Sequence, residues 1–359
     1  MIAVKNHRRG VGLSPVPADT DLLPSRDAGA VAALLALCPA AAETPLRDAP
    51  ALARRAGIAA LRLKDESPRM GLGSFKALGA AYAIACDAQA ARAASGTEDW
   101  STALAGRTYA TASAGNHGLS VAAGARVFGA QAVIYLAASV PKAFAERLRA
   151  RGARVERAGE IYEQSMAAAA ETAETQGWTL LSDSSWPGYA APARRVMEGY
   201  LQMAAEAADR IGAPPTHVVV QAGVGGMAAA VAAHVRARWG DAPLVVVVEP
   251  EAAPALLQSV LAGRIVDAEG PVSAMGRLDC KTPSLIALNG LARDADVFAT
   301  VAEEEAAHAV SILREAGVQT TPSGAAGVAA LLSAGPLRET LGLTQESRAL
   351  AFVTEGPEA

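Results

Sequence analysis

Several residue types that mark particular protein classes are scarce in this chain of 359 residues. Its cysteines are Cys38, Cys86 and Cys280, which stand far apart without a CxxC spacing. An odd number of distant cysteines argues against both a disulfide framework and a zinc site. We therefore expect no structural disulfide and no bound metal.

Clusters of positive charge and long apolar runs are also missing. The net charge is −4 and no run of lysine or arginine stands out, so we expect no nucleic-acid partner. The opening stretch MIAVKNHRRGVGLSP lacks the apolar core of a signal peptide, and the apolar stretch 28–42 is too short to span a bilayer. We therefore expect a cytoplasmic protein with no membrane partner.

Short β-rich runs alternate with longer alanine-rich helical runs along the chain. Hydrophobic residues make up 51% of the sequence, which allows a sizeable core, and the length suits two domains. Strand, helix and strand in repeated order predict right-handed crossover units and parallel sheets, and hence an α/β fold. The predicted strands are 107–111, 132–136, 154–157, 179–182, 217–221, 244–249, 297–301 and 350–354, and helices are predicted over 120–128, 142–151, 162–176 and 193–211.

Three loops follow predicted strands and carry small or polar residues. They are residues 113–118 (SAGNHG), residues 223–226 (GVGG) and residues 320–324 (TTPSG). Parallel sheets bind ligands at the carboxyl ends of their strands, where such loops open into helices. These loops are therefore the candidate ligand-binding segments.

The loop formed by Gly223, Val224, Gly225 and Gly226, here called the glycine loop, allows more than one interpretation. Backbone N–H groups at a helix start can bind an anion such as a phosphate. The same residues also suit a plain strand-to-helix turn. With Ala228 they fit the GxGxxA dinucleotide fingerprint, for which Glu249 would be the ribose-binding acid.

Lys76 stands in the stretch GLGSFKALGA, among small residues and just before a predicted helix. A lysine that forms a Schiff base needs a desolvated pocket, and small neighbours let a flat ring lie close to the backbone. An ordinary lysine at a helix start is the alternative. The combination of Lys76 with the glycine loop and the Asn116 loop favours the Schiff-base lysine.

This combination resembles the fold-type II pyridoxal-phosphate enzymes, the tryptophan-synthase-β and threonine-dehydratase group. Within that group the chain is most similar to the diaminopropionate ammonia-lyase family. The resemblance spans residues 44–356 and includes the segments KDESPRMGL (64–72), DSSWPGY (183–189) and VTEG (353–356). It implies two parallel-sheet α/β domains with pyridoxal 5'-phosphate in the cleft between them.

The resemblance also implies roles for individual residues. Lys76 would bind the cofactor as a Schiff base, and its phosphate would lie on the glycine loop. Asn116 would hydrogen-bond the ring hydroxyl, and Thr354 would meet the pyridine nitrogen with a neutral hydroxyl. The backbone of Ser113, Ala114 and Gly115 would bind the substrate carboxylate, with His117 orienting this loop. The sequence places all of these residues in the three candidate loops, beside Lys76 or at the end of a predicted strand.

Asp183 is the distinguishing residue of the ammonia-lyase resemblance. The resembling enzymes use this aspartate to remove the α-proton of the L-substrate, although an aspartate can also simply cap the turn before Trp186. Members that also accept the D-isomer carry a second aspartate where this chain has Ala114. We therefore expect the L-isomer to be preferred, and note that position 114 is like that of the threonine dehydratases.

The expected function is conversion of an amino acid to a 2-oxo acid and ammonia by β-elimination. The main hypothesis is a 2,3-diaminopropionate ammonia-lyase that forms pyruvate, and the alternative is a threonine-, serine- or hydroxyaspartate-type dehydratase. A nicotinamide-dependent dehydrogenase and a cofactor-binding protein without catalysis are further alternatives. We expect a larger discontinuous domain (1–80 and 200–359), a smaller one (81–199) and a homodimer.

Overall fold

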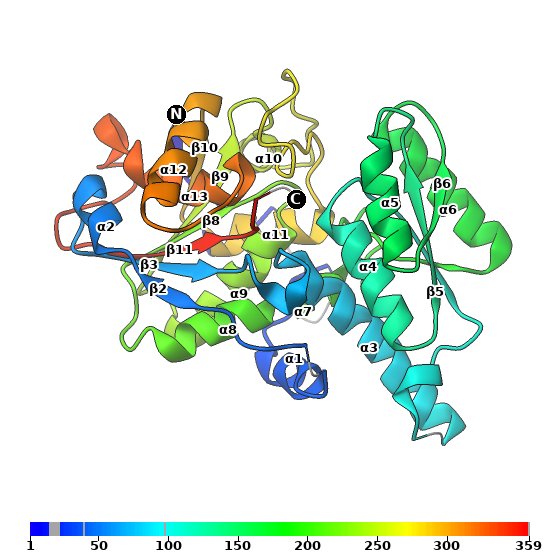
Figure 1. Ribbon diagram of the computed structural model, residues 1–359. Coiled ribbons are helices and arrows are strands. Elements are labelled where there is room, and N and C mark those ends of the chain that lie inside the picture. Colours follow the sequence, from blue (N-terminus) through cyan, green and yellow to red (C-terminus); the bar gives the residue numbers. More distant parts are fainter. Residues whose placement is uncertain (14–21, 39, 97, 358–359) are drawn as a thin grey trace.

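The computed structural model describes residues 1–13, 22–38, 40–96 and 98–357. These residues form an α/β structure with two separate sheets (Figure 1). The strands are β1 (Ala3–Lys5), β2 (Leu46–Asp48), β3 (Ala60–Asp65), β4 (Thr108–Ala112), β5 (Gln131–Leu136), β6 (Arg154–Arg157), β7 (Thr179–Leu180), β8 (His217–Gln221), β9 (Leu244–Pro250), β10 (Val297–Val301) and β11 (Arg348–Val353).

The helices connect these strands and cover the sheets. They are α1 (Ala28–Leu35), α2 (Pro50–Ala56), α3 (Lys76–Ser95), α4 (Asn116–Val127), α5 (Lys142–Ala150), α6 (Tyr162–Gln176), α7 (Ala191–Gly199), α8 (Leu201–Arg210), α9 (Gly226–Trp239), α10 (Ala255–Ala262), α11 (Leu285–Asp294), α12 (Glu303–Glu315) and α13 (Pro322–Leu332). Short 3₁₀ turns lie at Arg69–Gly71, Trp100–Thr102 and Gly335–Leu337. In the described part of the chain, none of the helices has the length and apolar character that a membrane crossing requires.

The larger sheet has the strand order β1-β10-β9-β8-β11-β3-β2. Its central pairs are parallel, and the two edge strands, β1 and β2, are antiparallel to their neighbours. In β9, Val245 and Val247 face one core cluster, whereas Val246 and Val248 face the other. Because both faces are covered by helices, the strand is apolar throughout and shows no polar alternation.

The smaller sheet has the order β6-β5-β4-β7, and all of its described pairs are parallel. In β5, Ile134 packs into the core shared with α3 and α4, and Val133 packs on the other face with Ala169 and Ala173 of α6. Figure 1 shows this sheet, with α5 and α6, on the side away from α2, α12 and α13. The described structure therefore has one sheet on each side of α3 and α4.

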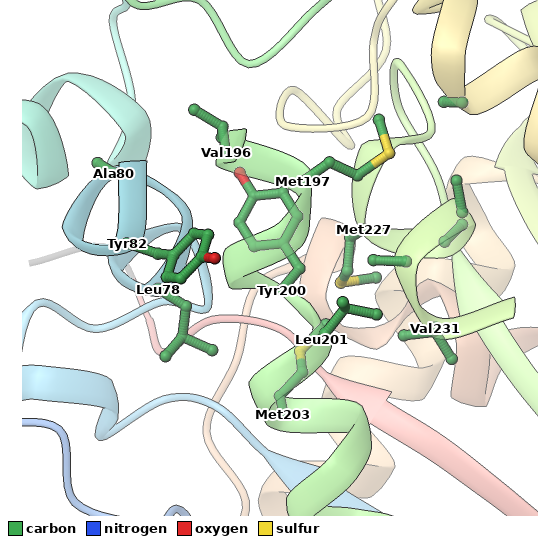
Figure 2. Close-up of a cluster of buried hydrophobic side chains, with 14 of the residues drawn as sticks. Leu78, Ala80, Tyr82, Val196, Met197, Tyr200, Leu201, Met203, Met227 and Val231 are labelled. Atoms are coloured by element: carbon green, nitrogen blue, oxygen red, sulfur yellow. The ribbon is translucent and has the colours of Figure 1, made fainter. Parts of the chain in front are cut away.

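A cluster of buried side chains joins α3 to α7, α8 and α9. Figure 2 shows Leu78 of α3, Tyr200 and Met203 around the start of α8, and Met227 and Val231 of α9. Gly79 and Gly199 allow α3 and α7 to approach closely, because a Cβ at Gly79 would lie 2.8 Å from the Val196 carbonyl oxygen. This packing fixes the direction in which α3, and therefore Lys76 at its first position, points from the larger sheet.

The structure confirms the predicted α/β fold and the predicted strands, with shifts of one or two residues at their ends. It adds β1, β2 and β3, which the sequence pattern did not reveal. The helix predicted over 193–211 is wrong in one respect, because Tyr200 divides it into α7 and α8. The expectation of parallel sheets is also wrong at the two edges of the larger sheet.

Candidate active site

Lys76 is the first residue of α3, directly after a tight turn that follows β3. The turn has left-handed backbone at Met70, with a φ of 51°, and at Gly71 and Gly73. Positive φ is uncommon for a residue with a side chain and points to a surrounding structure that imposes it. The sequence placed Lys76 before the helix, and the structure makes it the first helical residue.

A buried group of charged side chains, here called the charged cluster, supports this turn from below. It consists of Lys64, Glu66, Arg69 and Glu206, each less than 9% exposed. Arg69 donates to both carboxylates, at 2.8 Å to Glu66 and 2.6 Å to Glu206, and Lys64 Nζ donates to Glu206 at 2.6 Å. Burial opposes the charge on Glu206, but the hydrogen bond and charge of Arg69 hold the pKa of its carboxyl below the ordinary value.

The Lys76 ammonium forms a close ion pair with the carboxylate of Asp183. Burial disfavours both charges, yet their mutual attraction outweighs it, so the pKa of Lys76 is raised and the pKa of Asp183 is lowered. About a fifth of each side chain remains exposed, at 23% and 18%. The structure therefore brings together the two residues that the sequence analysis selected as catalytic candidates.

Asp183 lies in the loop after β7, three residues beyond the end of that strand. The predicted strand over 179–182 was too long, because β7 ends at Leu180. Tyr189 fixes the loop: its hydroxyl donates to the Leu180 carbonyl and accepts from the Ser182 N–H, both at 2.9 Å. The ring of Tyr189 also stacks on Trp186 at a centroid distance of 4.3 Å. A rigid loop thus holds the Asp183 carboxylate beside Lys76.

The glycine loop joins the end of β8 to the start of α9. Gly225 has a φ of 97°, and Gly226 is the first helical residue. A Cβ at Gly223 would lie 2.9 Å from Cys280 Sγ and 3.1 Å from the Arg277 carbonyl oxygen. Only glycine fits there, and the first N–H groups of α9 have no partner within the helix. This is an arrangement that can bind an anion.

The loop between β4 and α4 is organised by Ser113. Its Oγ accepts from the N–H groups of Gly115, at 3.2 Å, and Gly118, at 3.0 Å. The Gly115 N–H, which the resemblance assigns to the substrate carboxylate, is therefore already hydrogen-bonded in this structure. Asn116 and His117, the first residues of α4, lie at helix positions whose N–H groups have no partner within the helix.

His117 links this loop to the Asp183 loop. Its Nε2 lies 2.8 Å from the Leu181 carbonyl oxygen, so Nε2 must carry the hydrogen. Burial lowers the pKa of the His117 imidazole, which is 3% exposed. A neutral imidazole in this position ties α4 to the segment before Asp183.

Asn116 and Thr354 meet partners that sequence reasoning had not selected. Asn116 Nδ2 donates to the Glu355 carboxylate at 2.6 Å, and Thr321 Oγ1 donates to the other Glu355 oxygen at 2.5 Å. Thr354 Oγ1 accepts from Gln221 Nε2 at 3.3 Å. Glu355 belongs to the VTEG segment, so its position was visible, but nothing in the sequence indicated that its carboxylate is buried.

Glu249, the acid required by the dinucleotide interpretation, has another role. It is completely buried, and its two carboxylate oxygens accept from the N–H groups of Leu256 and Leu257 at 2.7 and 2.8 Å. Burial raises the pKa of Glu249 to about 8. The Glu249 side chain therefore holds the start of α10 and does not reach a ribose.

Comparison with known proteins identifies the family. The family described as "Pyridoxal-phosphate dependent enzyme" matches residues 37–355. Diaminopropionate ammonia-lyase of Escherichia coli K12 is 30% identical over 87% of this chain and 84% of its own length. The Salmonella typhimurium enzyme of the same name is 34% identical over 68% of this chain, and the match spans 65% of that enzyme.

Solved structures agree with the sequence relatives. The Escherichia coli diaminopropionate ammonia-lyase, in complex with an aminoacrylate-PLP azomethine reaction intermediate, superposes with a TM-score of 0.87 at 28% identity over 99% of this chain and 93% of that one. A bacterial threonine deaminase, from T.th., gives a TM-score of 0.76 at 26% identity, covering 94% of this chain and 99% of that one. These findings set aside the dehydrogenase alternative. The chain belongs to the pyridoxal-phosphate-dependent enzymes and has the fold-type II architecture of that family.

Proposed function

We propose that this enzyme converts L-2,3-diaminopropionate and water to pyruvate and two molecules of ammonia. The observation that carries the proposal is the ion pair between Lys76 and Asp183, beside the glycine loop and the start of α4. The named relatives support the choice of substrate, because diaminopropionate ammonia-lyases match this chain over most of its length.

The residues of the site fit pyridoxal phosphate. The glycine loop and the start of α9 would hold the phosphate, Lys76 would hold the aldehyde carbon, and Asn116 and Thr354 would contact the ring. The buried Tyr200 hydroxyl, which has no hydrogen-bond partner among the described residues, is a further donor close to Lys76. Pyridoxal phosphate, when bound, supplies an electron sink for the pair left after an α-proton is removed.

Asp183 is proposed to accept the α-proton of the substrate. While Lys76 carries its positive charge, that charge holds the pKa of Asp183 down against the effect of burial. Any reaction that removes the charge from the Lys76 nitrogen leaves burial unopposed and raises the basicity of Asp183. The carboxylate thus becomes a better proton acceptor when the lysine is occupied, and it stays fixed by the Tyr189 loop.

The second candidate function is a dehydratase acting on a β-hydroxy amino acid. Ala114 favours it, because the chain lacks a carboxylate at that position and is similar there to the threonine dehydratases. A "Serine dehydratase-like" protein of Rattus norvegicus is 29% identical over 81% of this chain and 82% of its own length. The leaving group would then be water in place of ammonia.

Two proposals concern organisation. We propose a larger domain of residues 1–80 and 200–359 and a smaller one of residues 81–199, with the cofactor between them; the separate sheets support this division. Limited proteolysis between α7 and α8 tests this boundary. We also propose a cytoplasmic homodimer, which light scattering after size-exclusion chromatography tests for its oligomeric state and cell fractionation tests for its location.

A substrate panel tests the proposed reaction. The purified enzyme with its cofactor is given L- and D-2,3-diaminopropionate, L-serine, L-threonine and 3-hydroxyaspartate, and both ammonia and 2-oxo acid are measured. The proposal predicts the highest kcat/KM for L-2,3-diaminopropionate, with two ammonia molecules released per pyruvate. A preference for a β-hydroxy substrate would favour the dehydratase, and no turnover of any substrate would contradict both.

A further inference from the structure

A positively charged side chain from a distant loop reaches the proposed substrate-binding loop. Arg277 lies between α10 and α11, and its Nη1 donates to the Ala114 carbonyl oxygen at 3.3 Å. A Cβ on Gly115 would lie 3.2 Å from the same Nη1. The Arg277 side chain is 33% exposed. The guanidinium therefore lies directly over Ala114 and Gly115 and is reachable from solvent.

The position of Arg277 is fixed from two sides. Its backbone N–H donates to Ser323 Oγ at 3.1 Å, and its carbonyl oxygen lies against Gly223 of the glycine loop. Its Nε is 3.8 Å from a carboxylate oxygen of Glu355. The arginine thus contacts the proposed phosphate loop with its backbone and the proposed substrate loop with its side chain.

The charge of Glu355 shows why a cation is needed here. Its carboxylate is buried, and it accepts from Asn116, the first residue after Gly115. A substrate carboxylate held by this loop would approach a fixed negative charge, and two carboxylates repel strongly where water is excluded. The donors for it are also reduced, because the Gly115 N–H is bonded to Ser113 Oγ. A guanidinium at this point offsets the repulsion and adds donors.

We propose that Arg277 binds the α-carboxylate of the amino-acid substrate and so makes the enzyme selective for free amino acids over their amides and esters. A planar guanidinium matches a carboxylate with two parallel hydrogen bonds, which a single backbone N–H cannot do. The inference rests on the proposed function only in requiring an amino-acid substrate. Arg277 is a specificity-determining residue; proton removal belongs to Asp183.

The test compares an acid with its amide. L-Alanine and L-alaninamide lack a β-leaving group, and the change in cofactor absorbance on their addition gives a Kd for each. Charge-assisted hydrogen bonds are strong enough that Arg277→Met should raise the Kd for L-alanine at least about tenfold. The Kd for L-alaninamide should stay within about twofold. For the reactive substrate, KM should rise by the same factor as the L-alanine Kd while kcat changes little.

The matched control is Arg264→Met, which removes an exposed arginine from the same loop. It should leave both dissociation constants unchanged. If Arg277→Met weakens acid and amide equally, or neither, Arg277 serves only as the ion-pair partner of Glu355 and the proposal is overturned. If Arg277→Met does not take up the cofactor, Arg277→Lys replaces it, and its acid-to-amide Kd ratio should still rise at least about threefold, since lysine loses the planar fork. An unchanged ratio in that variant also overturns the proposal.

Failure of the proposed reaction would be recognised separately. An enzyme that binds L-alanine but releases no ammonia from L-2,3-diaminopropionate refutes the ammonia-lyase activity and leaves the comparison of acid and amide fully informative.

Discussion

Two sets of paired charges lie at either end of the same short turn, and they differ in how completely they are satisfied. In the charged cluster, Arg69 alone donates to Glu66, Glu206, the Thr44 hydroxyl and the Ala42 carbonyl. Lys76, at the other end, pairs with Asp183, and both remain partly exposed. A buried network with many partners is costly to break, whereas a single pair at the edge of a site can be opened and reformed.

The comparison suggests a division of labour along the segment from Lys64 to Lys76. The charged cluster fixes the backbone, including the left-handed Met70, and the Lys76–Asp183 pair performs the chemistry. Loss of a cluster residue should therefore affect stability, and loss of Lys76 or Asp183 should affect turnover. The following experiments challenge that division, beginning with the largest expected effect.

Replacing the lysine gives the largest effect. Lys76→Ala should lower kcat for L-2,3-diaminopropionate at least about ten-thousandfold, because residues that act as one catalytic unit cause losses of this size. The melting temperature without cofactor should change little. Lys142→Ala, at the start of α5 and outside the site, is the control and should keep full activity. Substantial turnover by Lys76→Ala would remove the lysine from the mechanism.

Breaking the charged cluster should act on stability. Arg69→Met leaves Glu66 and Glu206 buried without their main cation, and the loss of one partner from a buried pair typically costs about 3–5 kcal/mol. The free energy of unfolding is measured by denaturant titration. The control, Arg62→Met, removes an arginine from an exposed pair with Asp48 and should cost less than about 1 kcal/mol. Equal losses in the two variants would show that the cluster is not the stabilising element.

Replacing the aspartate should act on turnover alone. Asp183→Asn should reduce kcat for L-2,3-diaminopropionate at least about a hundredfold, since general-base assistance is typically worth that much, while the cofactor absorbance remains. Stopped-flow and steady-state assays measure the loss. A nearly fully active Asp183→Asn enzyme would make Lys76 the better candidate for the base and would favour the dehydratase.

Acid should expose the contribution of Glu206. The pKa of Glu206 is lowered in the folded state, so the unfolded chain binds more protons and stability falls as pH drops below about 4.5, its unperturbed value. Glu206→Gln lacks this titration. Its free energy of unfolding should be lower than that of the unaltered protein at pH 7 and should decline less between pH 7 and pH 3. Parallel pH profiles would contradict the assignment.

The smallest effect concerns the stereochemistry. Ala114→Asp should raise turnover of D-2,3-diaminopropionate at least about tenfold without improving the L-isomer, because it adds a carboxylate where the chain has none. The new carboxylate would lie beside Arg277, which should keep it ionised. A chiral assay of both isomers measures the ratio. No gain with the D-isomer would mean that position 114 does not face the α-proton.

The sequence was sufficient for the parts of the fold that have strong local patterns. The valine-rich runs of β8 and β9 predicted central parallel strands because residues buried on both faces show no polar alternation. By contrast, β3 reads ALRLKD, and its Lys64 is buried only because Glu206, 142 positions away, neutralises it. No local pattern contains that information. The break at Tyr200 likewise follows from the close approach of α3 at Gly199, where a Cβ would clash with the Leu78 carbonyl oxygen.

The site shows the same limit. Lys76, Asp183 and the glycine loop were found because they stand in recognisable segments. Arg277 and Cys280 lie in an irregular loop, and only the folded chain brings them against Gly115 and Gly223. Burial raises the pKa of the Cys280 thiol to about 11, so this cysteine is a neutral part of the loop's packing and not a nucleophile. Contacts of this kind depend on tertiary structure and could not be inferred from the sequence.

The central claim is that Lys76 binds the cofactor covalently beside Asp183. Borohydride reduction of the cofactor-loaded enzyme, followed by peptide mass mapping, tests it most directly. The account predicts a pyridoxyl group on the peptide containing Lys76 and on no other lysine. A label on another lysine, or no label on an enzyme that retains its visible absorbance, would contradict the account.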